Sequence, residues 1–179
     1  MRAALGGLVA ALALLIAEPS AAKGELKPVK GAIVAGDFIA QDLRGKSTRF
    51  GELRGKVVLL NFWATWCSPC RKEMPAMGRL YQAYKDHGLV VVAVSQDQAP
   101  LAAVRSFAEE LKLGFPVWHD RDGLVGRQYS VPGVPTSYLI GADGRMAFRV
   151  LGEYDWFSPE ARAVVEAMLA TPQEHGDKR

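Results

Sequence analysis

Cysteine and histidine are scarce in this sequence of 179 residues, which contains two cysteines and three histidines. A structural zinc site takes about four Cys or His ligands, so this chain could complete one only with a partner chain. A domain stapled by disulfides carries more cysteines, placed farther apart. Only two residues separate Cys67 from Cys70, so a bridge between them closes too small a loop to constrain the unfolded chain strongly. The pair is therefore better explained by chemistry than by scaffolding.

Long runs of like charge are also missing. The chain has 22 Lys and Arg against 19 Asp and Glu, a net charge of +3, and these residues are spread along its length. Nucleic-acid-binding proteins usually concentrate basic residues in a run or a patch, so we expect no nucleic-acid partner. With 49% hydrophobic and 23% charged residues, the composition is typical of one globular domain with a substantial core.

The first apolar run is too short for an ordinary membrane span. It covers residues 5–17, whereas a spanning helix needs ~20 apolar residues. Arg2 precedes the run and small residues follow it at 20–22, which is the pattern of a signal peptide over residues 1–22, cleaved after Ala22. The alternative is an uncleaved N-terminal anchor that tethers the domain to a membrane. Both predict a periplasmic or otherwise extracytoplasmic domain.

Three further segments are predicted after the signal peptide. Residues 23–36 are polar and contain Pro and Gly, which indicates a linker. We expect the folded domain over 37–170, beginning with a hairpin at 37–56, where glycines mark the turns. Residues 171–179 are polar and indicate a flexible tail.

Within the domain, apolar and β-branched runs alternate with segments of helical periodicity. The runs predict strands over 57–63, 89–95, 115–119, 136–140 and 146–151. The periodic segments predict helices over 71–85, 101–111, 124–129 and 159–169. The unbroken run at 57–63 is typical of a central strand buried on both faces. This order predicts an α/β fold with a mixed central sheet flanked by helices.

The cysteine pair lies between the first of these long strands and the helix that follows it. Cys67 is thereby placed at the start of the helix, where free N–H groups and the helix dipole stabilise a thiolate, the attacking species in disulfide exchange. Cys70 falls one turn inward, close enough to attack a mixed disulfide formed at Cys67 and release the substrate. Pro69 between them fixes the backbone without needing an N–H. The spacing suits a nucleophile and a resolving cysteine.

The segment around the pair resembles the TlpA/ResA family of extracytoplasmic thioredoxin-like proteins. The resemblance rests on residues 61–75, which read NFWATWCSPCRKEMP, on GKVV at 55–58 and on GVPTSYLI at 133–140. It extends over residues 37–170, nearly the whole predicted domain. It implies a thioredoxin fold with an N-terminal β-hairpin extension and an extra α/β insertion.

The same resemblance implies a thiol-disulfide oxidoreductase that reduces protein disulfides through a Cys67/Cys70 dithiol. Such relatives serve cytochrome c maturation or copper-centre assembly in cytochrome oxidase. The implied partners are disulfide-containing client proteins and a membrane electron donor of the DsbD/CcdA type, because a reductant in an oxidising compartment must be recharged. We expect no cofactor and no metal, and we expect the scattered His87, His119 and His175 to be structural or exposed.

Three residues near the pair are expected to meet the client. The resemblance implies that Pro135 is cis and faces the cysteines, so that the backbone of Val134 is presented to an incoming peptide that adds as a strand. Trp66, directly before Cys67, is expected to shield the site or to contact substrate. Trp63 is expected in the core.

Asn61 distinguishes this chain from thioredoxins, which carry a buried Asp six residues before the first cysteine. Because Asn61 cannot ionise, another group must supply the base if resolution by Cys70 needs one. Glu73 lies one helical turn after Cys70 and is the best candidate, and TlpA/ResA relatives commonly carry Glu there. The alternative for Glu73 is a solvent-exposed carboxylate on the helix surface.

Other activities on this fold stay open. A peroxidase of the peroxiredoxin type needs a Thr three residues before its reactive cysteine, but Ala64 occupies that position and Thr65 lies one place off. A disulfide oxidase is a second alternative, because the dipeptide at 68–69 is compatible with either direction. A copper chaperone of the Sco type would need three residues between its cysteines. A non-enzymatic binding module would not depend on Cys67.

Overall fold

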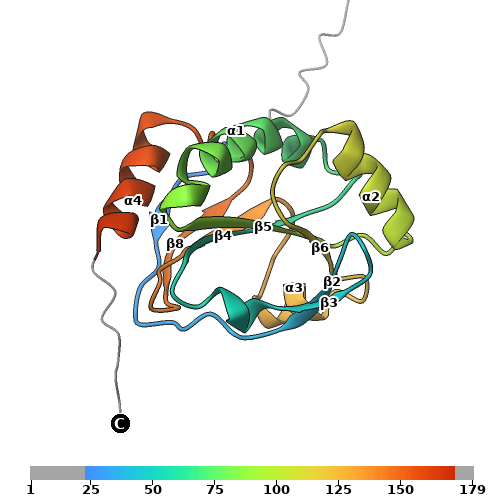
Figure 1. Ribbon diagram of the computed structural model, residues 1–179, viewed down its shortest axis with the longest axis horizontal. Helices are drawn as coiled ribbons and strands as arrows, with labels where there is room; N and C mark the ends of the chain where they lie inside the picture. Colours follow the sequence, from blue (N-terminus) through green and yellow to red (C-terminus); the bar gives the residue numbers. More distant parts are fainter. Residues whose placement is uncertain (1–22, 172–179) are drawn as a thin grey trace, which may run out of the picture.

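The computed structural model describes residues 23–171, which fold around one eight-stranded β-sheet (Figure 1). The predicted signal peptide and residues 172–179 of the predicted tail lie outside the described residues. The strands are β1 (Lys27–Pro28), β2 (Ile39–Asp42), β3 (Ser47–Arg49), β4 (Val57–Trp63), β5 (Leu89–Ser95), β6 (Val117–His119), β7 (Thr136–Ile140) and β8 (Met146–Leu151). The helices are α1 (Ser68–Tyr84), α2 (Leu101–Glu110), α3 (Leu124–Gln128) and α4 (Pro159–Ala170), with 3₁₀ turns η1 (Phe50–Leu53) and η2 (Lys85–His87).

The sheet is mixed, with the strand order β1-β8-β7-β4-β5-β6-β2-β3. Strands β4, β5 and β6 are parallel, and β7 pairs antiparallel with β4. The hairpin β2–β3 extends the sheet by pairing antiparallel with β6. The segment α2–β6–α3 is inserted between β5 and β7. The predicted fold class, with its hairpin extension and extra α/β insertion, is confirmed.

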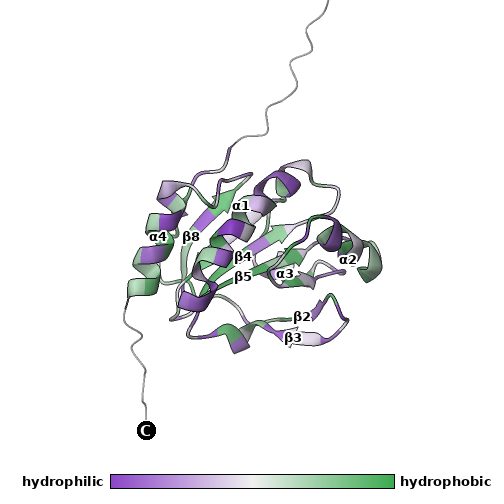
Figure 2. Cartoon of the chain, turned by 45° about the horizontal axis from the view of Figure 1, so that its top comes forward, coloured by the Kyte–Doolittle hydropathy of each residue, from purple (hydrophilic) through white to green (hydrophobic). Residues whose placement is uncertain are grey.

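Different elements cover the two faces of the sheet (Figure 1). All seven residues of β4 are buried, and successive side chains of a strand point to opposite faces. Leu59 and Trp63 therefore join the core beneath α1, α2 and α4, whereas Leu60 and Phe62 join the core toward η1 and α3. Figure 2 shows green along β5 and purple bands on α1 and α4, the pattern of amphipathic helices that cover a sheet.

Local signals explain where two elements begin. The hydroxyl of Ser158, the N-cap residue of α4, accepts a hydrogen bond from the N–H of Ala161 (3.2 Å). Pro159 takes the first helical position, where no N–H donor is needed. Gly88, with φ of 102°, turns the chain from η2 into β5 in a conformation that favours glycine.

The linker predicted over residues 23–36 is instead a bonded edge of the sheet. Strand β1 pairs antiparallel with β8, with Lys27 opposite Arg149, and the N–H of Ala35 donates to the carbonyl of Gly144 (2.9 Å). The outer edge of β8 leaves backbone N–H and C=O groups open, and an extended segment can bond to them whatever its side chains are. Pairing of this kind depends on the backbone alone. The sequence therefore shows no alternation of apolar and polar residues that would predict strand β1.

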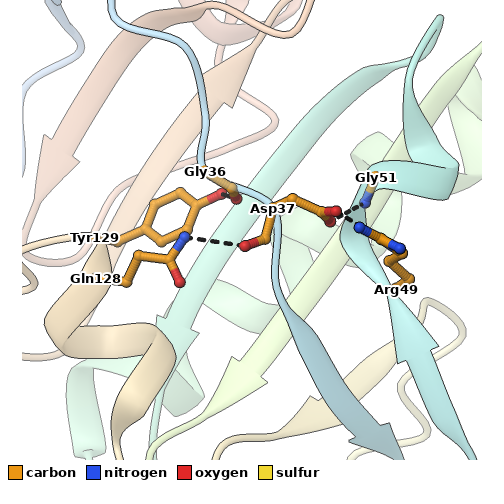
Figure 3. Close-up of polar contacts among 6 residues, drawn as sticks. All are labelled: Gly36, Asp37, Arg49, Gly51, Gln128 and Tyr129. Atoms are coloured by element: carbon orange, nitrogen blue, oxygen red, sulfur yellow. Dashed lines mark hydrogen bonds and ion pairs between the residues drawn. The ribbon is translucent and has the colours of Figure 1, made fainter.

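A polar contact fixes the start of the hairpin extension (Figure 3). The Asp37 carboxylate accepts hydrogen bonds from Arg49 Nε (2.6 Å) and from the N–H of Gly51 (2.7 Å). The hydrogen bond from Arg49 holds the pKa of the Asp37 carboxyl below its usual range. From the other side, the Tyr129 hydroxyl of the segment after α3 donates to the carbonyl of Gly36 (2.6 Å). The chain is thus held where it enters the domain.

Candidate active site

Cys67 and Cys70 lie at the N-terminal end of α1, directly after the loop that leaves β4. They form a disulfide, with Cα atoms 5.3 Å apart. Cys67 is the N-cap residue of the helix, and its Sγ accepts a hydrogen bond from the N–H of Cys70 (3.2 Å). The structure thus places the first cysteine at the helix start, as the spacing predicts.

The two cysteines differ in their access to solvent. Cys67 is 4% exposed, and Cys70, one turn further into the helix, is completely buried. In the reduced protein, the N–H donors of the first turn and the helix dipole favour negative charge on Cys67 Sγ. Cys67 is therefore the more accessible of the two cysteines.

The two tryptophans before the pair have opposite environments. Trp66 is 73% exposed and lies directly beside Cys67. Trp63, the last residue of β4, is fully buried, and its ring packs on Phe107 with the ring centroids 5.0 Å apart. The predicted core position of Trp63 is confirmed.

The loop before β7 lies at the same edge of the sheet as the cysteine pair. Phe62 pairs with Thr136, so residues 134–135 lie beside the end of β4 that leads to the cysteines. The peptide bond between Val134 and Pro135 is cis, as the resemblance implies. Val134 also packs against the core cluster that contains both cysteines. Among residues 23–171, neither the N–H nor the C=O of Val134 forms a backbone hydrogen bond.

Glu73 is buried on α1, one turn after Cys70. Only 2% of the residue is exposed, which excludes the alternative of a carboxylate on the helix surface. Its Oε1 accepts a hydrogen bond from Asn61 Nδ2 (2.8 Å), and its Oε2 accepts one from the N–H of Tyr154 (3.1 Å). Burial raises the pKa of Glu73 to about 8, and the two hydrogen bonds offset only part of the increase. The carboxyl is therefore mostly protonated at neutral pH, yet close to ionising.

Asn61 links Glu73 to strand β7. Its Nδ2 also donates to Ser137 Oγ (2.9 Å), and Asn61 and Ser137 are as buried as Glu73. The sequence points to Asn61 and Glu73 by their spacing from the cysteines, but it gives no signal for Ser137 or Tyr154. These two partners lie 76 residues from Asn61 and 81 residues from Glu73 along the chain.

A surface groove is lined in part by Glu73. Tyr154 and Glu160 line one side, and Lys72 and Arg79 come from α1. Because acidic and basic side chains both line the groove, its charge favours no class of ligand.

The two histidines among the described residues, His87 and His119, take no part in this site. His87 is exposed, and His119 is buried with its Nε2 hydrogen-bonded to the carbonyl of Asp97 (2.7 Å). His175 lies outside the described residues. Over residues 23–171, no group of three or more His, Cys, Asp or Glu side chains could hold a metal ion. In the same part of the chain, no helix has the length and apolar character needed to cross a membrane.

Comparisons with known proteins agree on a family for this site. The AhpC/TSA family matches residues 33–149. The thiol-disulfide oxidoreductase ResA of Bacillus cereus is 43% identical over 119 residues, which cover 66% of this chain and 68% of that protein. The chain belongs to the AhpC/TSA family and to the ResA-type thiol-disulfide oxidoreductases. A second ResA, from Oceanobacillus iheyensis, is 39% identical over 149 residues, 81% of this chain and 77% of that protein.

Solved structures support the same conclusion for the fold of this ResA-type chain. The thioredoxin domain of a thiol-disulfide oxidoreductase from Bacteroides vulgatus superposes with a TM-score of 0.69 at 28% identity. The match covers 79% of this chain and 99% of that domain. The thioredoxin fold implied by the resemblance is confirmed.

The ResA-type chain is an enzyme of disulfide exchange, since its named relatives are thiol-disulfide oxidoreductases and it carries the Cys-x-x-Cys pair that this chemistry requires. The peroxidase alternative is not favoured. Ala64 stands where that activity needs Thr, and the hydroxyl of the neighbouring Thr65 donates to Asp97 Oδ1 (2.6 Å).

Proposed function

We propose that this enzyme reduces disulfides of exported client proteins, with Cys67 as the attacking sulfur, Cys70 as the resolving sulfur and Glu73 as the proton acceptor. The observation that carries the proposal is the buried Glu73 carboxyl, one turn behind Cys70 and hydrogen-bonded to Asn61. Burying a carboxyl lowers the stability of the fold, and carboxyls with strongly shifted pKa values are common at functional sites. A buried carboxyl close to a redox-active cysteine pair therefore supports a role in proton transfer.

The reaction takes two displacements. The Cys67 thiolate attacks one sulfur of the client disulfide, the client S–S bond breaks, and the other client sulfur leaves as a thiolate that takes a proton from solvent. In the fraction of the enzyme whose Glu73 is ionised, the Cys70 thiol then gives its proton to the Glu73 carboxylate, and the Cys70 thiolate attacks Cys67 Sγ. The mixed disulfide breaks, the second client sulfur leaves as a thiolate that takes a proton from solvent, and the client is released as a dithiol. Two electrons have passed from the enzyme to the client, which leaves the Cys67–Cys70 disulfide.

The raised pKa suits Glu73 to this step. An ordinary Glu ionises near pH ~4.3 and a free Cys near ~8.5, so an unperturbed carboxylate is a weak base toward a thiol. Burial raises the pKa of Glu73 to about 8, which is close to the pKa of a free thiol. The raised pKa makes the Glu73 carboxylate a stronger base toward a thiol than an ordinary carboxylate is, which favours general base catalysis. The groove beside Glu73 lets the proton leave afterwards.

We assign client binding to Val134, Pro135 and Trp66. The open backbone N–H and C=O of Val134 support pairing with an extended client segment. The exposed ring of Trp66, the residue before Cys67, offers an apolar contact. Main-chain pairing favours no particular client sequence, so the enzyme can accept more than one client.

The setting we propose is the periplasm or another extracytoplasmic compartment. It is supported by the apolar run at 5–17 and the small residues that follow it, which fit a signal peptide or an N-terminal anchor. In that compartment the oxidised enzyme must be reduced again, which calls for a membrane electron donor of the DsbD/CcdA type. The clients we propose belong to cytochrome c maturation or to copper-centre assembly in cytochrome oxidase.

Trapping the mixed disulfide tests the assignment of the two sulfurs. Reduced Cys70→Ser enzyme is mixed with a peptide that contains one disulfide, and non-reducing mass spectrometry follows the products. We expect a stable adduct at Cys67, and we expect reduced Cys67→Ser enzyme to form none. An adduct with Cys67→Ser but not with Cys70→Ser would contradict the proposal.

A further inference from the structure

The loop between β4 and the cysteine pair is fastened to a buried carboxylate from a different strand. Asp97 follows β5 and is only 2% exposed. Its Oδ1 accepts a hydrogen bond from Thr65 Oγ1 (2.6 Å), and its Oδ2 accepts one from the N–H of Thr65 (2.9 Å). Both hydrogen-bond donors of one loop residue therefore end on one carboxylate. Hydrogen bonds to a charged acceptor are among the stronger ones in proteins.

Asp97 is itself held in place on the side away from the loop. Ser95 Oγ donates to Asp97 Oδ2 (2.7 Å) and accepts from the N–H of Asp97 (3.1 Å). The carbonyl of Asp97 is hydrogen-bonded to Nε2 of the buried His119 (2.7 Å). Within residues 23–171, no Lys, Arg or His side chain forms an ion pair with the Asp97 carboxylate. Three neutral donors satisfy it, and two of them belong to Thr65.

Thr65 lies two residues before Cys67, so a shift of the Thr65 backbone would also shift the Cys67 sulfur. The N–H of Cys67 donates to the carbonyl of Ala64 (3.1 Å), which closes a tight turn across Thr65 and Trp66. This turn delivers Cys67 to the N-cap position, where its Sγ meets the N–H of Cys70. Rotation of the turn would move Sγ away from the donors that favour its thiolate form.

We propose that Asp97 is a positioning residue for disulfide exchange, which holds Thr65 and thereby keeps Cys67 Sγ at the N-terminus of α1. The inference rests on the proposed role of Cys67 as the attacking sulfur. It applies to reduction and to oxidation alike, because both directions pass through the same Cys67 thiolate. Asp97 does not touch the client; it acts through Thr65.

The sign of its effect distinguishes positioning from simple electrostatics. If the charge of Asp97 acted on Cys67 directly, Asp97→Asn would favour the thiolate, because a nearby negative charge disfavours a second one. If Asp97 acts through position, Asp97→Asn disfavours the thiolate, because Asn has one acceptor oxygen and cannot accept all three hydrogen bonds. Thr65→Val should then have the same effect as Asp97→Asn without any change of charge.

The experiment measures the rate of iodoacetamide reaction at Cys67 against pH in reduced full-length enzyme. For Asp97→Asn and Thr65→Val, we expect the midpoint pH to rise by about half a unit or more, a roughly threefold loss of thiolate near neutral pH. The double variant should be no worse than either single one, because both remove the same interaction. Thr65→Ser keeps the hydroxyl and should restore wild-type behaviour.

Ser95→Ala removes the two hydrogen bonds between Ser95 and Asp97 and leaves both bonds from Thr65 to Asp97. We expect its midpoint to rise by less than that of Asp97→Asn or Thr65→Val, because Thr65 keeps both of its hydrogen bonds. An unchanged or lowered midpoint in both Asp97→Asn and Thr65→Val, with circular dichroism showing folded protein, would overturn the inference, as would additive effects in the double variant. Failure of the proposed function is a separate result, namely peptide disulfide reduction that survives Cys67→Ser.

Discussion

The side-chain amide of Asn61 donates a 2.8 Å hydrogen bond to the Glu73 carboxyl, across the contact between β4 and α1. Both residues are at most 2% exposed. Thioredoxins carry an ionisable Asp at the strand position. In this enzyme the strand residue is the hydrogen-bond donor and the helix residue is the acid. The ionisable carboxyl of this enzyme therefore lies on α1, whereas that of thioredoxins lies on the strand.

Replacing Glu73 by Gln should slow resolution of the mixed disulfide. Without the carboxylate, Cys70 must give its proton to water, and loss of a general base costs roughly a hundredfold in rate. Stopped-flow fluorescence of Trp66 during oxidation by a peptide disulfide measures this step. Alkylation of Cys67 is the control and should change by less than about twofold. Unchanged resolution would remove Glu73 from the mechanism.

The pH dependence of stability should follow Glu73 in the oxidised enzyme, which has no free thiol to titrate. Because burial raises the pKa of Glu73 from 4.5 to about 8, the folded state favours the protonated form. The contribution to stability is full below about pH 4.5 and is lost as pH rises to about 8.

Wild type should therefore lose up to about 5 kcal/mol relative to Glu73→Gln between those two limits, since one pKa unit corresponds to about 1.4 kcal/mol. Urea unfolding of both oxidised proteins across this range measures the difference, in which other titrating groups cancel. A difference that does not vary with pH would show that Glu73 has an ordinary pKa.

Replacing Asn61 by Asp, the residue that thioredoxins carry, should destabilise the folded enzyme. Asn61→Asp would set a second buried carboxyl at hydrogen-bond distance from Glu73, and the two could share one proton but could not easily both ionise. We expect a loss of roughly 1 to 3 kcal/mol in unfolding free energy near pH 9 and a smaller loss near pH 5. Calorimetry of the oxidised variant at both pH values provides the test. Equal losses at the two values would contradict a charge-based cause.

Removing the exposed ring of Trp66 should affect clients more than stability. Because Trp66 is 73% exposed, Trp66→Ala should change the unfolding free energy by less than about 1 kcal/mol. We expect kcat/KM toward a folded protein disulfide to fall by roughly threefold to tenfold, with little effect on a small disulfide such as oxidised glutathione. Leu124→Ala, which removes a 64% exposed side chain elsewhere, is the control. Equal losses for both substrates would argue against client contact.

Local patterns account for what the sequence predicts correctly. The strand over Val57–Trp63 is evident because all seven side chains are buried, and Cys67 is placed at a helix start because a strand and a periodic segment flank it. Glu73 is identified by its spacing from Cys70. These inferences need only residues that are close together in the chain.

What the sequence does not predict depends on register between distant segments. Tyr154 and Ser137 meet the Asn61–Glu73 pair only because β7 and the segment after β8 lie beside β4 and α1. Thr65 meets Asp97, 32 residues away, only because β4 and β5 pair in one register. A one-residue slip would turn these side chains to the other face. No local pattern specifies that register.

The reduction potential of the Cys67–Cys70 couple tests the central claim most directly. Equilibration with defined ratios of reduced and oxidised dithiothreitol or glutathione, followed by acid quenching and mass analysis, gives its value. A protein disulfide reductase requires a potential near that of thioredoxin, about −270 mV. That is the value we predict. A potential near that of DsbA, about −120 mV, would make the enzyme a disulfide oxidase and would contradict the account.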